Sequence, residues 1–493
     1  MALLFCDGFD KYGPVAGVTA TIQAALLAGE WTSASLSLAN IVAGLSNTGY
    51  AVSFGVITTA PYKTLATSYS RLIGGIRIQS TLASAGGVTF LDSATNQCSI
   101  TINTTGLISI RTGGTSGTAL STSTVSVSAN STHYLEWDIT FAASGAYQVW
   151  LDGVSLFSGT GATKSSSNSS ANQFQLNGTN IIYDDLYLFD TTGSTNNAVL
   201  LTSPQIETQF PNADSSVQFS FGAAILGSAY ATVSPVGAPG ANELFLRKVT
   251  TGPTGQLASV ACIPQATSAG ANFKSVVYAD SAGSPTGSTL ATGTQVTGTT
   301  SGTTLTSSFA SPPTLSASTA YWLGFITDTS VNLSLTDNAT VAGSKAANTY
   351  GSGPPTNPTM TTGQSSWLIY GNMTGIAVDW YEEDINPPPG DISYVSSSTS
   401  GNEDLYSFPA LTTPNPANIY SVVVKGYIRR TDSGARTVSI QCKSGGTDSA
   451  ATTVTPGTTY GWIDGNFDTD PATSSAWGAS GVNSATSGFK IAS

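Results

Sequence analysis

Short apolar runs separated by turn-forming residues extend through this chain from one end to the other. Within the runs, apolar and polar residues alternate or β-branched residues predominate. Between them stand glycine, serine, asparagine, aspartate and proline. A strand that buries one face alternates with a period of two, and tight turns favour those separating residues. Many short runs in series are typical of β-sandwiches, so the sequence predicts an all-β fold of antiparallel sandwich domains.

The predicted strands are clearest where the alternation is regular. They are Ser99–Asn103, Leu107–Arg111, Tyr134–Phe141, Tyr147–Leu151, Ile181–Phe189, Phe273–Tyr278, Tyr321–Ile326, Tyr420–Ile428 and Val438–Lys443. Within Tyr147–Gly159, the pair Asp152-Gly153 separates two alternating runs and predicts a hairpin with a two-residue turn. Helix candidates are few, and the best two, Ile22–Leu27 and Leu36–Ala43, are short.

One local unit occurs three times, around Tyr134, Tyr321 and Tyr460. Each unit has a polar turn, then Thr-x-Tyr, then an aromatic strand. The turn places a tyrosine at the strand start, where its ring can pack and its hydroxyl can reach water or backbone. Three such units favour three similar sandwiches.

Few side chains in this chain can move protons or bind metals. Charged residues make up 9% of the 493 residues, against roughly 25% in an ordinary soluble domain, and His133 is the single histidine. Catalysis in water depends mostly on such groups. This composition favours a surface-building or binding protein over an enzyme, and His133 itself is expected to be a surface residue.

Charge and hydropathy narrow the expected partners and location. The net charge is −12 without a basic cluster, which argues against nucleic acid and against anionic membrane surfaces. No apolar run approaches the ~20 residues of a membrane span. The first apolar run is short and lacks a preceding basic region, so synthesis in the cytoplasm without a signal peptide is expected.

The four cysteines, Cys6, Cys98, Cys262 and Cys442, are isolated from one another in the sequence. No CxxC pair exists, which makes a zinc site improbable. Small buried thiols are the simplest interpretation. A pairing of Cys6 with Cys98 within one domain is left open.

The first 196 residues resemble the laminin-G-like/concanavalin A-like jelly roll. The resemblance is carried by Asp7-Gly8-Phe9-Asp10 near the start, the Tyr147–Gly159 hairpin and a closing strand at Tyr183–Asp190. In that family the first and last strands pair and a late hairpin of this type is common. The resemblance therefore implies that the chain's first strand lies beside Tyr183–Asp190.

A second resemblance is to virion proteins of tailed bacteriophages that carry this jelly roll. The matching segments are Met1–Tyr12, Tyr183–Asn196, Ile206–Asp214, Asp391–Tyr406, Val424–Ala435 and Trp462–Trp477. In shorter members, the segment matching Ile206–Asp214 runs almost directly into the one matching Asp391–Tyr406. The resemblance thus implies an inserted jelly-roll-like sandwich at 221–374 and a discontinuous sandwich formed by 197–220 and 375–493.

The same resemblance to laminin-G-like folds suggests one candidate metal site. If the end strands pair, Asp7 and Asp10 come close to Asp184 and Asp185, and the four carboxylates could bind Ca²⁺ at a rim. Calcium takes about six to eight oxygen ligands. Aspartates that cap turns are the commoner explanation, and no other cofactor is expected.

Three further groups of residues are candidate sites. Exposed aromatic rings stack on sugars, so candidate glycan-binding residues are Trp31, Trp322, Trp367 and Trp477, with core packing as the alternative. Glu136 and Asp138 would share a strand face, as in concanavalin-like glycosidases, but Thr140 or Phe141 stands where the acid/base carboxylate is needed. The densest acidic run, Glu382–Asp384, fits a solvated linker, a cation site or an assembly contact.

These observations predict a non-enzymatic structural protein on the virion surface, in the tail or fibre apparatus, that contributes to host attachment. Its expected partners are other phage virion proteins and host-surface glycans. A head decoration or head-fibre protein is the alternative, and a carbohydrate-active depolymerase is a third hypothesis that the missing acid/base disfavours. By analogy with fibres we expect a homo-oligomer, with a trimer favoured.

Overall fold

A computed structural model gives the fold of most of the chain. The residues that it describes are 3–12, 30–31, 41–46, 49–54, 60–192, 196–227, 231–237, 240–251, 254–265, 268–298, 303–336, 343–364, 367–374, 394–412, 416–449 and 452–493. The secondary structure is almost entirely β, in several antiparallel sheets, as the sequence predicts.

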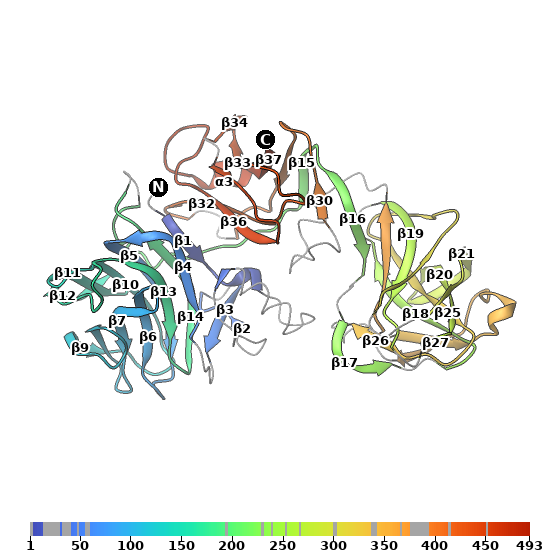
Figure 1. The fold of residues 1–493 in the computed structure, drawn as a ribbon, viewed down its shortest axis with the longest axis horizontal. Coiled ribbons are helices and arrows are strands. Elements are labelled where there is room, and N and C mark those ends of the chain that lie inside the picture. Colours follow the sequence, from blue (N-terminus) through green and yellow to red (C-terminus); the bar gives the residue numbers. More distant parts are fainter. Residues whose placement is uncertain are drawn as a thin grey trace. The chain divides into compact units, whose positions relative to one another are not determined.

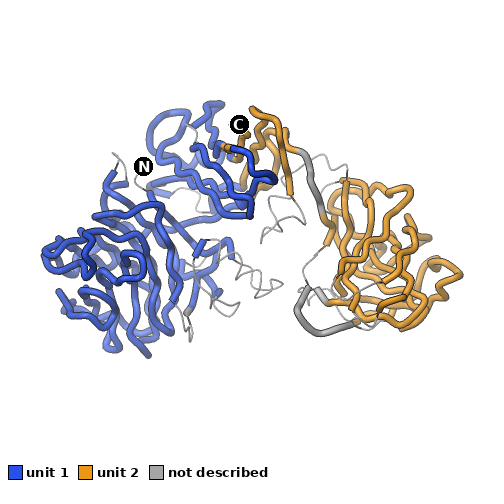
Figure 2. The backbone as a smooth tube through the Cα atoms, viewed as in Figure 1, with its two compact units in different colours: residues 1–209, 409–435, 439–487 blue, residues 210–408, 436–438, 488–493 orange. Residues whose placement is uncertain are grey.

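The chain forms two compact units, coloured separately in Figure 2. The first combines residues 1–209, 409–435 and 439–487, and the second combines 210–408, 436–438 and 488–493. Most of the second unit, residues 210–408, is therefore inserted between two segments of the first, while its last residues, 488–493, follow the first unit's final segment. The three-domain division predicted from the sequence stays a prediction. The sequence predicts that residues 197–220 and 375–493 form one discontinuous sandwich. One pairing links these two segments, because Ala213–Val217 (β15) pairs with Glu403–Ser407 (β31).

The first unit contains a jelly-roll sandwich of two antiparallel sheets (Figure 1). One sheet has the order β12-β11-β10-β5-β14-β3-β2, with β1 paired to β14, and the other has the order β4-β13-β6-β7-β8-β9. The strands are β1 Leu3–Asp7, β2 Ile41–Ala43, β3 Tyr50–Phe54, β4 Tyr62–Tyr69, β5 Arg71–Ser80, β6 Gly86–Asp92, β7 Thr95–Ile102, β8 Leu107–Thr112, β9 Ala119–Ser126, β10 Thr132–Thr140, β11 Gly145–Leu151, β12 Val154–Gly161, β13 Ala171–Asn177 and β14 Ile181–Phe189.

The alternation seen in the sequence decides which face of each strand is buried. Along β10, Leu135, Trp137 and Ile139 enter the core between the sheets. Trp137 stacks on Phe174 of the opposite sheet, with ring centroids 5.7 Å apart. Such packing removes large apolar surfaces from water, at roughly 25 cal/mol per Å², and this burial holds the two sheets together.

Two features implied for the jelly roll are present. Strand β1 pairs antiparallel with β14, with Asp7 opposite Leu186. Strands β11 and β12 form the hairpin, and Asp152 and Gly153 at its turn have φ values of 51° and 75°. Positive φ at both central residues is the requirement of a type I′ turn, which explains the Asp-Gly pair.

The second unit contains a sandwich around its own core (Figure 1). One sheet has the order β23-β19-β29-β16-β30 with β24 beside β19, and the other has the order β21-β20-β25-β18-β27-β28 with β22 beside β20. Phe245 packs against Phe325 and Trp367 inside it. The strands are β16 Ser220–Leu226, β17 Ala231–Gly237, β18 Glu243–Thr250, β19 Gly255–Cys262, β20 Asn272–Ser281, β21 Ser284–Thr292, β22 Val296–Thr297, β23 Leu305–Ser308, β24 Thr314–Leu315, β25 Ala320–Thr327, β26 Leu333–Thr336, β27 Gly343–Ala347, β28 Thr361–Gln364, β29 Ile369–Thr374 and β30 Tyr394–Ser396.

The C-terminal part of the chain supplies further short strands and little helix. These elements are β32 Val422–Ile428, β33 Val438–Ser444, β34 Thr447–Asp448, β35 Thr452–Val454, β36 Gly461–Phe467, α3 Ala479–Ser484 and β37 Thr486–Ile491. Strand β32 pairs antiparallel with β36 along its whole length. In the described part of the chain, no helix is long and apolar enough to cross a membrane.

Neither of the two predicted helices is observed among the described residues. The prediction of a helix over Leu36–Ala43 is wrong at its described end, because Ile41–Ala43 is strand β2 and pairs with β3. Pairing with a neighbouring strand satisfies the backbone of this segment, which overrides its local helical pattern. The other predicted helix, Ile22–Leu27, lies outside the described residues. All nine clear strand predictions coincide with observed strands.

Candidate functional site

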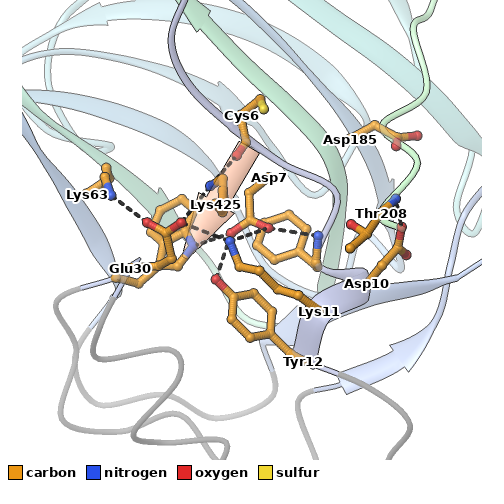
Figure 3. Close-up of polar contacts among 12 residues, drawn as sticks. Cys6, Asp7, Asp10, Lys11, Tyr12, Glu30, Lys63, Asp185, Thr208 and Lys425 are labelled. Carbon is orange, nitrogen blue, oxygen red and sulfur yellow. Dashed lines mark hydrogen bonds and ion pairs between the residues drawn. The ribbon is translucent and has the colours of Figure 1, made fainter. Parts of the chain in front are cut away.

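A buried group of charged side chains, joined by several ion pairs, lies at the end of β1 in the first unit. We call it the lysine–carboxylate cluster; its members are Asp7, Lys11, Glu30, Lys63 and Lys425 (Figure 3). They come from separate parts of the chain: the end of β1, the 3-10 turn η1 (Asp10–Tyr12), the short described stretch 30–31, β4 and β32. Asp7 and Lys11 are four residues apart in the sequence, and assembly of the fold brings Glu30, Lys63 and Lys425 to them.

Glu30 is the centre of the cluster. Its Oε1 accepts hydrogen bonds from Lys11 Nζ at 2.9 Å and Lys425 Nζ at 2.6 Å, and its Oε2 accepts one from Lys63 Nζ at 2.7 Å. Burial by itself would raise the pKa of Glu30, but the three ammonium groups outweigh it and hold the pKa well below the usual range. Glu30 is therefore a carboxylate at neutral pH.

Asp7 faces a different set of donors. Its Oδ1 accepts the backbone N–H of Phe9 at 2.9 Å, and its Oδ2 accepts the Tyr12 hydroxyl and the Trp31 Nε1–H, both at 2.8 Å. Lys11 Nζ lies 3.6 Å from Oδ1. The side chain of Asp7 is 1% exposed, so these protein donors replace the water that it would otherwise bind.

The lysines of the cluster lie against aromatic rings. Lys425 and Lys63 lie over the ring of Phe5, with Nζ 5.1 and 4.3 Å from its centroid, and Lys11 lies 5.6 Å from that of Trp462. Ring faces attract cations. Burial lowers the pKa of Lys11, whereas at Lys425 the attraction of Glu30 overcomes burial and raises the pKa.

The central groups of the cluster contact one another more than they contact solvent. The side chains of Lys11 and Glu30 are 9% and 5% exposed. Three lysines face two carboxylates, so the cluster concentrates amine and carboxyl groups in a largely buried site, at whose margin Lys63 and Lys425 are 21% and 18% exposed. Its direct structural effect is to bind β32 to the jelly roll through Lys425.

The carboxylates of the aspartates predicted to bind calcium accept hydrogen bonds from N–H groups of the protein. Asp10 accepts the N–H of Tyr50 at 2.7 Å, and Asp184 accepts that of Leu45 at 2.8 Å. Asp185 accepts from Arg77 Nε at 2.7 Å and from the N–H of Ile206. Among the described residues, no three His, Cys, Asp or Glu side chains are grouped as metal ligands. The calcium site stays a prediction, and these contacts favour the turn-capping alternative.

Burial nevertheless perturbs two of these aspartates strongly. It raises the pKa of Asp10 to about 6, against the lowering effect of its backbone hydrogen bonds. It raises the pKa of Asp184 to about 8, with further raising by the charge of Asp185. Both carboxyls therefore favour their protonated forms more than an exposed aspartate does.

The four tryptophans considered for glycan stacking are buried. A stacking ring needs an open face, so this expectation is corrected in favour of core packing, the alternative that the sequence also allows. Their exposed fractions are Trp31 1%, Trp322 5%, Trp367 2% and Trp477 4%. The indole N–H of Trp322 donates to Asp280 and that of Trp477 to the carbonyl of Phe467, so both are anchored in place.

Glu136 and Asp138, the glycosidase-like pair on β10, both have partners within the protein. Glu136 is fully buried, and its Oε1 accepts the Tyr187 hydroxyl at 2.6 Å and the backbone N–H groups of Leu200 and Leu201 at 3.0 Å. Asp138 forms a two-pronged ion pair with Arg71. The linker after β14 therefore covers Glu136.

The remaining candidates have structural surroundings. His133 Nδ1 lies 2.8 Å from Asp152 Oδ2 at the hairpin turn, with the ring partly exposed. All four cysteines are free thiols, as expected, and Cys6 does not pair with Cys98. The acidic run Glu382–Asp384 lies outside the described residues.

Sequence reasoning missed the lysine–carboxylate cluster. One signal could have pointed to it, because Lys425 interrupts the apolar run Val422–Ile428 and a lysine inside such a strand needs a buried partner. Nothing local identifies Glu30 as that partner.

Comparison with known proteins gives structural likenesses alone. No protein-family model matches the chain, and no curated protein matches it. Solved structures with a similar sandwich include the carbohydrate-binding module CBM66 from Bacillus subtilis, at 14% identity, covering 33% of this chain and 92% of that one, with a TM-score of 0.22. Alginate lyase Aly36B is 10% identical over 37% of this chain and 95% of its own, with a TM-score of 0.28. An endo-β-1,4-glucuronan lyase from Trichoderma reesei is 13% identical over 29% and 82%, with a TM-score of 0.22.

Proposed function

We propose that this protein is a non-enzymatic structural component of a tailed-phage particle, in the tail or fibre apparatus, that contributes to attachment to host-surface glycans. The observation that supports it best is that the continuous segment 210–408, which makes up most of the second unit, is inserted between two segments of the first. The first unit is completed by the C-terminal segment, since Asn466 Nδ2 donates to the carbonyl of Leu3 and Lys425 Nζ to Glu30. A sandwich nested in this way can serve as a separate module on an anchored scaffold.

The state of the proton-moving groups supports a non-enzymatic role. Glu136 is covered by backbone N–H groups, Asp138 is paired with Arg71, and His133 is tied to Asp152. General acid–base catalysis needs such groups within reach of a substrate. The three residues instead stabilise a strand face and a hairpin turn.

The experiment that tests this proposal is immunogold electron microscopy of purified virions with an antibody raised against residues 221–374. Label at the tail tip or fibres is the expected result. Label spread over the head would replace the tail assignment with head decoration, and intact virions without label would overturn a surface role. Antibody preincubated with the purified protein is the control for specific labelling.

The proposal includes self-assembly, with a trimer favoured by analogy with fibres. Exposed strand edges and apolar side chains are common assembly contacts. The edge strand β12 carries Val154, which is 68% exposed, and β9 carries Val125, which is 59% exposed. Light scattering of the full-length protein gives the oligomeric mass, and a monomer at micromolar concentration would contradict this part of the proposal.

A further inference from the structure

We propose that Lys11 and Asp7 become joined by an intramolecular amide bond, formed within the folded lysine–carboxylate cluster with Glu30 as the proton carrier. Lys11 Nζ lies 3.6 Å from Asp7 Oδ1 and 2.9 Å from Glu30 Oε1. The three groups that such a condensation needs, an amine, a carboxyl and a second carboxylate beside the amine, are therefore in contact. Figure 3 shows Lys11 extended between Asp7 and Glu30.

The carboxyl of Asp7 is prepared as the electrophile. Tyr12 and Trp31 both donate to Oδ2, and the N–H of Phe9 donates to Oδ1. Attack on the carboxyl carbon places negative charge on these oxygens. Fixed donors aimed at a developing oxyanion on a carboxyl that is 1% exposed are the usual protein device for stabilising it.

Lys11 is the amine best placed to react. Its side chain is 9% exposed, and burial lowers its pKa, which favours the neutral amine that a nucleophile must be. Lys425 differs, because the attraction of Glu30 raises its pKa and keeps it an ammonium ion. Lys63 likewise serves as a cation at Glu30 Oε2.

Glu30 fits the role of proton carrier and not that of the acylated group. The ammonium groups of Lys63 and Lys425 hold it as a carboxylate, and an ionised carboxylate resists attack on its carbon. Its Oε1 nevertheless touches Lys11 Nζ, where it can accept the proton that the amine loses.

The step balances without any further reactant. Within the ion pair Lys11 first passes one proton to Asp7; the lone pair of the resulting neutral Nζ then attacks Cγ of the resulting carboxyl, and Glu30 takes a second proton from the nitrogen. Glu30 returns that proton to the departing oxygen of Asp7, which leaves with its own proton as one water molecule. The product is an Nζ–Cγ amide, and Glu30 is regenerated as a carboxylate.

Burial favours the product in two ways. The amide removes one amine and one carboxyl group from a site where each charge carries a desolvation cost. Reversal needs water at the bond, and the side chains of Lys11 and Asp7 are only 9% and 1% exposed. The bond would link the end of β1 covalently to the turn η1, where the jelly roll begins.

The test is mass spectrometry of the denatured full-length protein, purified from a folded pool. The expected mass is lower than the sequence mass by one water molecule, after allowing for removal of Met1. Trypsin cuts after lysine, so the free chain yields peptides 1–11 and 12–63, because no other lysine or arginine precedes Lys63. Trypsin does not cut after an acylated lysine, so the linked chain yields instead one peptide, 1–63, with the same loss of one water.

Variants separate this bond from other dehydrations. Asp7 precedes Gly8, and an Asp-Gly pair can lose water by closing a succinimide without Lys11. Lys11→Arg and Glu30→Gln should restore the full mass, whereas a succinimide would persist in Lys11→Arg and be opened by hydroxylamine. Lys164→Arg, at a surface lysine of the same unit, is the matched control and should keep the loss. A full-mass wild-type protein with free peptide 1–11 would overturn the proposal.

Discussion

Glu30 Oε1 and Lys425 Nζ lie 2.6 Å apart although 395 residues separate them in the chain. This ion pair joins β32 to the start of the jelly roll, and the side chain of Glu30 is 5% exposed. A buried pair of this kind makes the C-terminal segment part of the first unit, and the first prediction follows from removing one partner.

Replacement of Lys425 by methionine should destabilise the first unit by about 3 kcal/mol. The change keeps most of the side-chain volume but leaves Glu30 with one fewer counter-charge, and breaking a buried pair typically costs about 3–5 kcal/mol. Chemical denaturation followed by tryptophan fluorescence measures the difference. Lys443→Met is the control, because its pair with Asp448 is half exposed and should contribute less than about 1 kcal/mol. Equal effects of the two substitutions would contradict the structural role of the cluster.

The pKa of Asp184 near 8 predicts that stability falls as pH rises from about 4 to 8. The native state holds a proton that an unfolded aspartate, with a pKa of about 3.9, releases. This contribution is fully present below the unfolded value and is lost as pH rises through the folded value. Urea denaturation across this range should show a shallower decline in Asp184→Asn.

Asp10→Asn is the companion variant, because the pKa of Asp10 is raised to about 6 and its effect should be complete near that pH. A wild-type free energy of unfolding that rises between pH 6 and 8, with no change in Asp184→Asn, would show that Asp184 is not held protonated.

Deletion of Gly222–Thr374, with a short linker in its place, should leave a soluble protein that unfolds cooperatively. Most strands within this segment pair with one another, as β19 does with β29, and it has a separate apolar core. Strand β16 pairs with β29 inside the segment and with β30 outside it. Circular dichroism and a thermal melt measure the outcome. As a control, deletion of residues 1–196 should abolish folding of what remains of the first unit. Loss of soluble expression in the first deletion would contradict the nested arrangement.

Chelation of calcium should leave the melting temperature unchanged. Oxygens of Asp10, Asp184 and Asp185 already accept hydrogen bonds from backbone N–H groups, and a bound cation would compete with these donors. Differential scanning calorimetry with EDTA, and then with excess Ca²⁺, makes the measurement. A melting temperature that falls with EDTA and recovers with Ca²⁺ would restore the calcium site proposed from the sequence.

Several local features of the fold can be predicted from the sequence alone. The Asp152-Gly153 turn is identifiable because only a few residue pairs accept positive φ at both positions. The unit around Tyr134 is identifiable because a polar turn directly precedes an aromatic strand. The hydroxyl of Tyr134 donates to the carbonyl of Asp185. Strand β14 is predicted with its observed bounds, Ile181–Phe189, because a buried strand has a strong apolar signal.

The sequence by itself determined the all-β class, the main strands and the hairpin, since each depends on alternation or turn geometry within a few residues. Only the tertiary structure decided that Trp31 and Trp367 are core residues, because an apolar ring looks the same in sequence whether a second sheet covers it or not. It alone placed Lys425 and Lys63 beside Glu30 in one largely buried cluster. Such contacts form when sheets and distant segments pack together, and no local pattern encodes which buried charge meets which partner.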